Sequence, residues 1–323
     1  MNQTWTPLVS TIIPTYKRSE MVRAAVETVL TQDYPQLEVI VIDDNTDPQE
    51  QLNTRVALTD LIAGGRVVLI PNTHSKGACG ARNTGIAAAR GELIAFLDDD
   101  DRWLPGKISA QVHLLAQTDY VGALCQYIDI DLAFGHSRRC RASTPIWTRT
   151  QALGGECPTS TSLVLVKRQV LLDAGCFDET LPSFQDFDMW LRCLAFGDFA
   201  YVDEALVEFI QHAGDRTSVN IVRRLAGLAA IEKKWGREMS THTDFAVFRR
   251  RVRVDALIAN GKAKLGRNYF RSLSLFVRAL LADRGSKRTL FWLAIGLLGE
   301  RAGKALYRRL LSVRRVDTIA VVA

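Results

Sequence analysis

The chain has 323 residues, of which 47% are hydrophobic and 24% are charged, and its formal net charge is +6. This composition excludes a disordered or fibrous protein, and the length predicts one large core with an appended region. The six cysteines show neither a C-x-x-C spacing nor the density of a disulfide-rich secreted domain, so we expect free thiols in a reducing compartment.

The sequence predicts a cytoplasmic protein. Its N-terminus, MNQTWTPLVSTIIPTYKR, lacks the charged segment and long apolar run of a signal peptide. The longest apolar run, residues 290–298, is about half as long as a membrane-spanning helix needs to be. Peripheral attachment of the protein to the inner face of the membrane is the alternative location.

The first hundred residues alternate short β-branched runs with helical patterns, which indicates βαβ units around a parallel sheet. We expect strands at residues 8–13, 37–42, 67–70 and 93–97. Ser19 is expected to cap a helix after the first strand, and residues 77–90 predict another helix. The expected fold class is therefore α/β, with a Rossmann-like, doubly wound and mostly parallel sheet.

Polar side chains follow three of these strands at the point where each strand ends. Because the carboxyl ends of parallel strands meet at one edge of a sheet, these loops are expected to form a single pocket. Its predicted members are Pro14, Thr15, Tyr16 and Arg18 after the first strand, Asp43 and Asp44 after the second, and Asp98, Asp99, Asp100 and Asp101 after the fourth.

The mutual repulsion of four neighbouring carboxylates costs free energy unless a cation neutralises their charge. The preceding Leu-Ile-Ala-Phe-Leu is typical of a buried strand, so the first carboxylates leave a low-dielectric interior. Oxygen-only ligands favour a hard divalent ion, Mg²⁺ or Mn²⁺, bound together with substrate phosphates. The pair Asp43 and Asp44 is open to two interpretations, because Asp-Asp-Asn is equally good turn and helix-capping chemistry.

Further strands are expected at residues 121–130, 162–166 and 205–210, and His212 follows the last of them. A lone histidine is more often a structural hydrogen-bonding residue than a metal ligand. The polar residues 215–218 favour the functional alternative, because such a loop can hold phosphate oxygens.

Residues 184–194 predict a helix whose buried face carries Phe187, Trp190, Leu191 and Leu194. Asp186, at its start, either complements the helix dipole or acts as a general base sheltered by aromatic neighbours. Asp188 points elsewhere and is expected to be structural.

From about residue 218 the chain is expected to be helical, and the charge changes at the same place. Residues 1–216 carry 18 basic and 28 acidic groups, whereas residues 217–323 carry 23 basic and 7 acidic groups. We expect a catalytic domain over 1–217 and a basic, mainly helical region over 218–323. Its helices either pack on the first domain or lie, through residues 290–298 and 305–311, at an anionic membrane surface. The helix-like spacing of its aromatic residues argues against a nucleic-acid partner.

Four segments carry a resemblance to a known family: VSTIIPTYKR, TVLTQDYPQLEVIVIDDNTD, NTHSKGACGARNTGIAAARGELIAFLDDDDRWLPGKI and SFQDFDMWLR. In this order they resemble the family 2 glycosyltransferases of the GT-A fold, over roughly residues 7–218. The resemblance implies an enzyme that transfers a sugar with inversion from a nucleotide-sugar donor, with uridine the expected nucleoside. The implied acceptor is a hydroxyl of a glycan or lipid-linked molecule in cell-surface polysaccharide or glycolipid synthesis.

The resemblance also implies roles for individual residues. The loop with Pro14, Thr15, Tyr16 and Arg18 binds the nucleoside, and Asp44, with Asp43 beside it, recognises the base. Asp98 and Asp100 match the ends of an Asp-x-Asp motif, with Asp99 between them at the nucleotide sugar. The implied ligands of Mn²⁺ or Mg²⁺ are Asp98, Asp100 and His212.

Asp186 resembles the catalytic base, although Gln185 stands where the family often has Glu. The loss of that negative neighbour is expected to make Asp186 a somewhat weaker base. Lys76 and Arg82 match a segment whose basic side chains either contact the diphosphate or lock the aspartate loop.

Two functions of other classes stay open at the level of sequence. A Mg²⁺-dependent phospho-acceptor signalling domain also has an acidic pair after one strand and an aspartate after a later one, but it leaves His212 and the Gln-Asp-Phe-Asp segment unexplained. A non-catalytic nucleotide-sugar-binding module would have lost its base, whereas Asp186 is present.

Overall fold

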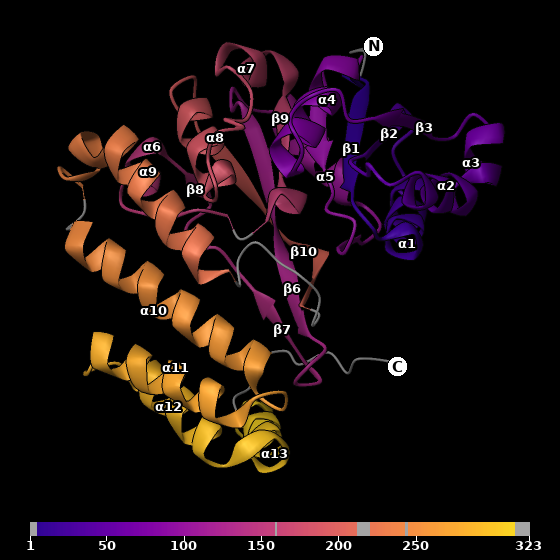
Figure 1. The fold of residues 1–323 in the computed structure, drawn as a ribbon. Helices are drawn as coiled ribbons and strands as arrows, with labels where there is room; N and C mark the ends of the chain where they lie inside the picture. The colour runs from indigo at the N-terminus through magenta and orange to yellow at the C-terminus, as the bar shows by residue number, and fades with distance from the viewer. Residues whose placement is uncertain (1–4, 159, 212–219, 243–244, 314–323) are drawn as a thin grey trace.

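A computed structural model describes residues 5–158, 160–211, 220–242 and 245–313, with side chains described as far as residue 309. At its centre lies a mixed sheet with the strand order β3-β2-β1-β4-β9-β6-β10-β5, to which β7 and β8 add on β6 and β10 (Figure 1). The strands are β1 (Val9–Thr15), β2 (Leu37–Asp43), β3 (Val68–Pro71), β4 (Leu93–Phe96), β5 (Arg102–Trp103), β6 (Gly122–Asp131), β7 (His136–Cys140), β8 (Ile146–Trp147), β9 (Leu165–Lys167) and β10 (Phe199–Gln211).

The predicted parallel half of the sheet is confirmed. β1 pairs in parallel with both β2 and β4, and β2 pairs in parallel with β3. The apolar runs of β1 and β4 are buried because these strands lie inside the sheet, whereas β3 at its edge is partly exposed. In the second half, β9 runs antiparallel to β4 and β6, and β10 is parallel to β6.

Two local predictions were wrong. The strand expected at 162–166 starts only at Leu165, because Thr161–Leu163 forms a 3₁₀ turn that begins at the Ser160 hydroxyl, which accepts from the Ser162 N–H. Ser19 is the first residue of a helix rather than its cap, and Arg18 at the cap position makes no capping hydrogen bond.

The residues that the structure describes form thirteen α-helices. They are α1 (Ser19–Leu30), α2 (Pro48–Ala57), α3 (Thr59–Ala63), α4 (Ala78–Ala88), α5 (Lys107–Ala116), α6 (Arg149–Leu153), α7 (Arg168–Asp173), α8 (Gln185–Cys193), α9 (Ile221–Met239), α10 (Phe245–Lys264), α11 (Tyr269–Ala282), α12 (Lys287–Leu297) and α13 (Gly299–Val313). The predicted face of α8 is buried as expected.

The apolar side chains form two cores. The larger includes the sheet and reaches into α9 and α10 through Leu228, Ile231 and Phe248. The smaller joins α10 to α13 and takes up Phe134 from the loop after β6. In Figure 1, α9 and α10 run beside the sheet, and α11 to α13 lie beyond α10. Within the described residues, none of these helices is both long and apolar enough to cross a bilayer.

Candidate active site

The loops after β1 and β4 are joined by charge-assisted hydrogen bonds. Thr15 Oγ1 donates to Asp99 at 2.9 Å, and Arg18 donates to Asp99 at 2.7 Å and to Asp100 at 3.0 Å. The loop after β2 joins them, because the Asp44 N–H donates to the Thr15 carbonyl at 2.9 Å. The three polar loops therefore meet at one edge of the sheet, as predicted.

The four consecutive aspartates have different surroundings. Asp98 pairs with Arg82 at 2.5 Å and accepts from the Thr161 hydroxyl at 3.2 Å. Burial raises the pKa of Asp99 to about 6, although its bond to Arg18 acts in the opposite direction. Burial also raises the pKa of Asp101, which accepts from the hydroxyls of Ser160 and Ser162.

One oxygen each of Asp98, Asp100 and Asp101 lies within 4.8 Å of the others. Such spacing fits a single divalent ion with bonds of about 2.0–2.6 Å, and three carboxylates are the donor set that a hard cation prefers. Of the predicted ligands, the structure brings Asp98 and Asp100 together, while His212 lies outside the described residues. The sequence interpretation did not include Asp101 among the candidate ligands, although it ends the same acidic run.

Asp44 already makes two hydrogen bonds within the protein. Its Oδ1 accepts from Asn72 Nδ2 at 2.7 Å, and its Oδ2 accepts from the Gly77 N–H at 2.9 Å. Asp43 accepts from the backbone and side chain of Asn45. Both carboxylates thus fix loops, and each keeps further lone pairs for a ligand.

Basic side chains border this edge of the sheet. Lys76 Nζ lies 4.5 Å from the centre of the Tyr16 ring, and Tyr16 is 40% exposed, so both are accessible to a ligand. Pro14 lies within β1, opposite Ile42. Arg82 is buried, and burial alone would lower its pKa, but the charge and hydrogen bond of Asp98 together with the nearby Cys79 and Asp186 raise it. Its Nε has no hydrogen-bond partner in the part of the chain that the structure describes.

Asp186 stands at the N-terminus of α8, half-buried, and its Oδ1 accepts from the Phe187 N–H at 2.8 Å. Burial raises the pKa of Asp186, and the charge of Asp98 adds to the rise. The N–H of Phe187 and the charges of Arg82 and Arg224 oppose it. Asp98 and Arg82 therefore act electrostatically on Asp186. Asp188 is fully buried, as expected of a structural residue, and bonds to Arg192, Lys234 and Trp235.

The sequence matches a family model, glycosyl transferase family 2, over residues 10–164. It is 33% identical to WcaA of Escherichia coli K12, a glycosyl transferase assigned to colanic acid biosynthesis, over 62% of this chain and 71% of that protein. It is 31% identical to WfaP of Escherichia coli, a UDP-Glc:alpha-D-GlcNAc-diphosphoundecaprenol beta-1,3-glucosyltransferase, over 59% and 71%. The chain belongs to glycosyltransferase family 2.

Solved structures with the same fold bind nucleotide sugars. Residues 1–349 of TarS from S. aureus, in complex with UDP-GlcNAc, align with a TM-score of 0.58 and 17% identity over 95% of this chain and 91% of that one. The mannosyltransferase PcManGT of Pyrobaculum calidifontis, in complex with GDP-Man and Mn²⁺, aligns with a TM-score of 0.57 and 18% identity over 95% and 88%. These alignments establish a GT-A-like fold with a C-terminal helical region for this glycosyltransferase.

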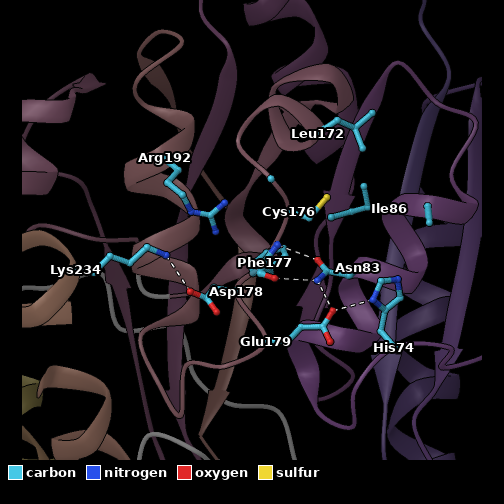
Figure 2. Close-up of a pocket in the computed structure, with 12 residues that line it drawn as sticks. His74, Asn83, Ile86, Leu172, Cys176, Phe177, Asp178, Glu179, Arg192 and Lys234 are labelled. Atoms are coloured by element: carbon cyan, nitrogen blue, oxygen red, sulfur yellow. Dashed lines mark hydrogen bonds and ion pairs between the residues drawn. The ribbon is translucent and has the colours of Figure 1, made fainter. Parts of the chain in front are cut away.

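The structure of this glycosyltransferase also contains a contact that the sequence did not predict. Glu179 lies 2.9 Å from His74 Nδ1 and accepts from Asn83 Nδ2 at 2.7 Å (Figure 2). Glu179 also accepts from the Ser75 N–H at 3.0 Å. It thereby ties the loop before α4 to the loop that leads to Asp186. No sequence pattern predicts this contact, because its partners lie about a hundred residues apart.

Proposed function

We propose that this glycosyltransferase moves a sugar, with inversion, from a UDP-linked donor to a hydroxyl of a glycan or lipid-linked acceptor in cell-surface polysaccharide or glycolipid synthesis. The observation that carries the proposal is the acidic cluster Asp98, Asp100 and Asp101 at the sheet edge, with Asp186 within its electrostatic reach. The uridine nucleotide is supported by the donor in the name of WfaP and by UDP-GlcNAc bound in TarS. The acceptor in the name of WfaP supports a lipid-linked acceptor.

In this mechanism Asp186 accepts the proton of the acceptor hydroxyl while its oxygen bonds to the anomeric carbon. The bond from that carbon to the donor phosphate oxygen breaks on the opposite side, so one displacement inverts the centre. Asp98, Asp100 and Asp101 would hold Mn²⁺ or Mg²⁺, which neutralises charge on the departing nucleoside diphosphate when bound. His212 stays a proposed ligand.

The other side chains bind and orient the donor. Tyr16 and Lys76 would contact the nucleotide from the exposed edge, and the remaining lone pairs of Asp44 would accept from the base. Arg82 is already committed to Asp98 and Thr161, which favours a role in locking the aspartate loop over a contact with the diphosphate. Arg18 would act in the same way on Asp99 and Asp100.

Purified protein tests these roles. UDP-, GDP- and dTDP-sugars with Mn²⁺ are screened for thermal stabilisation and for release of sugar, and UDP-glucose is then used with an α-GlcNAc diphosphate alkyl ester as acceptor. Asp186→Asn should lower transfer by about 10²- to 10⁴-fold without weakening donor binding. Asp100→Ala should weaken the Mn²⁺-dependent stabilisation by UDP. Near wild-type transfer by both variants would refute the assignment.

We further propose that the enzyme works in the cytoplasm at an anionic membrane surface through its C-terminal region. Helices α11 and α12, with the residue that follows α12, expose large apolar side chains, here called the apolar face: Phe270, Val277, Leu281, Leu290, Leu297 and Leu298. Residues 265–309 around it contain ten Lys and Arg but only Asp283 and Glu300 as acidic residues. This combination matches an anionic lipid interface. In the other predicted segment, Leu306 and Tyr307 pack against the smaller core instead.

Vesicle flotation distinguishes this membrane surface from simple helix packing. The wild type should float with vesicles that contain phosphatidylglycerol, and it should remain in the bottom fraction of the gradient with vesicles of phosphatidylcholine alone. Exchange of Phe270 and Leu281 for Ser should abolish flotation, whereas Val222→Ser, at an exposed apolar site on α9, should not. Failure of the wild type to float with either vesicle would remove the membrane proposal.

A further inference from the structure

The loop in front of Asp186 contains a residue in an unfavourable backbone conformation. Phe184, the last residue before α8, has φ 62° and ψ 26°, in the left-handed region that non-glycine residues rarely adopt. Such a conformation costs of order 1–3 kcal/mol and persists only where the surroundings fix it. The contacts around residues 177–184, here called the presenting loop, therefore determine where Asp186 lies.

One side of the presenting loop is fixed by α4. Asn83 makes two hydrogen bonds to the backbone of Phe177, donating to its carbonyl and accepting from its N–H, both at 2.9 Å. Asn83 also donates to Glu179, as Figure 2 shows. These bonds anchor the start of the loop to a helix that also carries Arg82.

The other side is fixed by α9, the first helix of the C-terminal region. Gly227 packs so closely against Ser183 that an added Cβ would lie 2.0 Å from the Ser183 hydroxyl oxygen and 2.8 Å from its carbonyl oxygen. The same hydroxyl donates to the Arg223 carbonyl at 3.1 Å. The guanidinium of Arg224 lies 5.0 Å from the centre of the Phe184 ring.

Two further contacts hold α9 in place along its length. Lys234 pairs with Asp178 of the presenting loop at 3.0 Å and with the buried Asp188 of α8 at 2.8 Å. Trp235 Nε1 donates to Asp188 at 2.8 Å. Helix α9 thus contacts the presenting loop at Asp178, Ser183 and Phe184, and contacts α8 directly.

We infer that α9 sets the position of Asp186 through its contacts with the presenting loop and α8, and that Gly227 and Arg224 are positioning residues. This inference rests on the proposed role of Asp186 as the base. A catalytic group has to be held within about 0.5 Å of its productive position, and a residue without a side chain at 227 lets the helix approach the loop that closely. The C-terminal region would then contribute to catalysis without touching the substrate.

Two glycines of α9 provide a matched test. Gly236 faces only the Glu232 side chain, 3.5 Å from an added Cβ, so Gly236→Ala should be accommodated. Alanine also favours a helix over glycine equally at both sites. Gly227→Ala should lower kcat at least tenfold relative to Gly236→Ala, with an unchanged KM for UDP-glucose, when both variants are assayed well below their Tm. Equal kcat values in two folded variants would overturn the inference.

Arg224→Met provides a second readout that a merely structural role would not move. The charges that act on Asp186 are those of Arg82 from α4, Arg224 from α9 and Asp98 after β4. The nearby thiols of Cys79 and Cys157 have raised pKa values, so they are uncharged in the pH range of this test. The charge of Arg224 lowers the pKa of Asp186, so its loss should move the acid limb of the pH profile of kcat/KM to higher pH. An acid limb at the same pH in both proteins would contradict the inference. If Gly227→Ala fails to fold, the pH profile of Arg224→Met tests the inference instead. An active Asp186→Asn would instead refute the proposed function.

Discussion

Lys107 gives a prediction whose size follows from its surroundings. It is the first residue of α5 and is completely buried. Its Nζ donates to Gln111 Oε1 at 2.8 Å and lies 4.0 Å from the Trp103 ring centre. No carboxylate pairs with it among the described residues. Burial therefore lowers the pKa of Lys107 from 10.5 to about 8.

The lowered pKa makes the folded protein less stable at neutral pH than at alkaline pH. Because the unfolded chain binds the proton more tightly, the charged form of Lys107 costs the fold about 3 kcal/mol below pH 8. Between pH 8 and 10.5 the folded state gives up its proton first, and the cost disappears. From pH 7 to pH 10 the stability that is regained amounts to about 2–3 kcal/mol.

Urea unfolding of the wild type and of Lys107→Met, at pH 7 and at pH 10, measures this term. The free energy of unfolding of the wild type should rise by about 2–3 kcal/mol relative to the variant over that interval. Groups common to both proteins cancel in the comparison, and Lys233→Met, at an exposed lysine of α9, is the control. A difference between wild type and Lys107→Met that stays constant with pH would refute the reasoning.

Three further predictions concern the donor loops and the base. Gly85→Ala should lower the free energy of unfolding by roughly 1–3 kcal/mol, because the added Cβ would lie 2.4 Å from Ile12 Cγ2. Urea unfolding measures this loss, and Gly285→Ala, whose added Cβ meets open space, is the control. Chelation of divalent ions with EDTA should abolish the thermal stabilisation of the protein by UDP, and stabilisation that persists would contradict the acidic cluster as a metal site. Because burial raises the pKa of Asp186, the acid limb of kcat/KM should lie above the ordinary value of 3.8 and activity should fall as pH falls through it; a limb at or below 3.8 would contradict the shift.

The sequence predicted those parts of the fold and site that depend on local periodicity and strand ends. The alternation of apolar runs predicted β1, β2, β3 and β4, and the carboxyl-end rule then brought Thr15, Arg18 and Asp99 together. The apolar spacing in residues 184–194 predicted the buried face of α8. Each of these inferences needs only residues that are neighbours along the chain or in a parallel sheet.

Contacts between distant segments could not be predicted in this way. Of the four consecutive aspartates, Asp99 and Asp101 are buried. The partners of Asp101 come from distant segments: the hydroxyls of Ser160 and Ser162 and the N–H of Ile210. The bonds from Asn72 and Gly77 to Asp44 likewise require the fold to be known. Identical side chains in one run thus acquire different roles from partners elsewhere in the chain.

The change of charge near residue 217 and the boundary between the two cores lie at different places in the chain. The domain division at 217 stays a prediction, but Leu228, Ile231, Phe248 and Val252 beyond it belong to the core of the sheet. The smaller core begins within α10. Basic residues of α9 such as Lys234 meet acidic groups of the first region, so part of the charge asymmetry acts across this contact. In α11 to α13, Arg288 pairs with Asp255 and Lys304 pairs with Glu300. The exposed apolar face lies in this same region of excess positive charge.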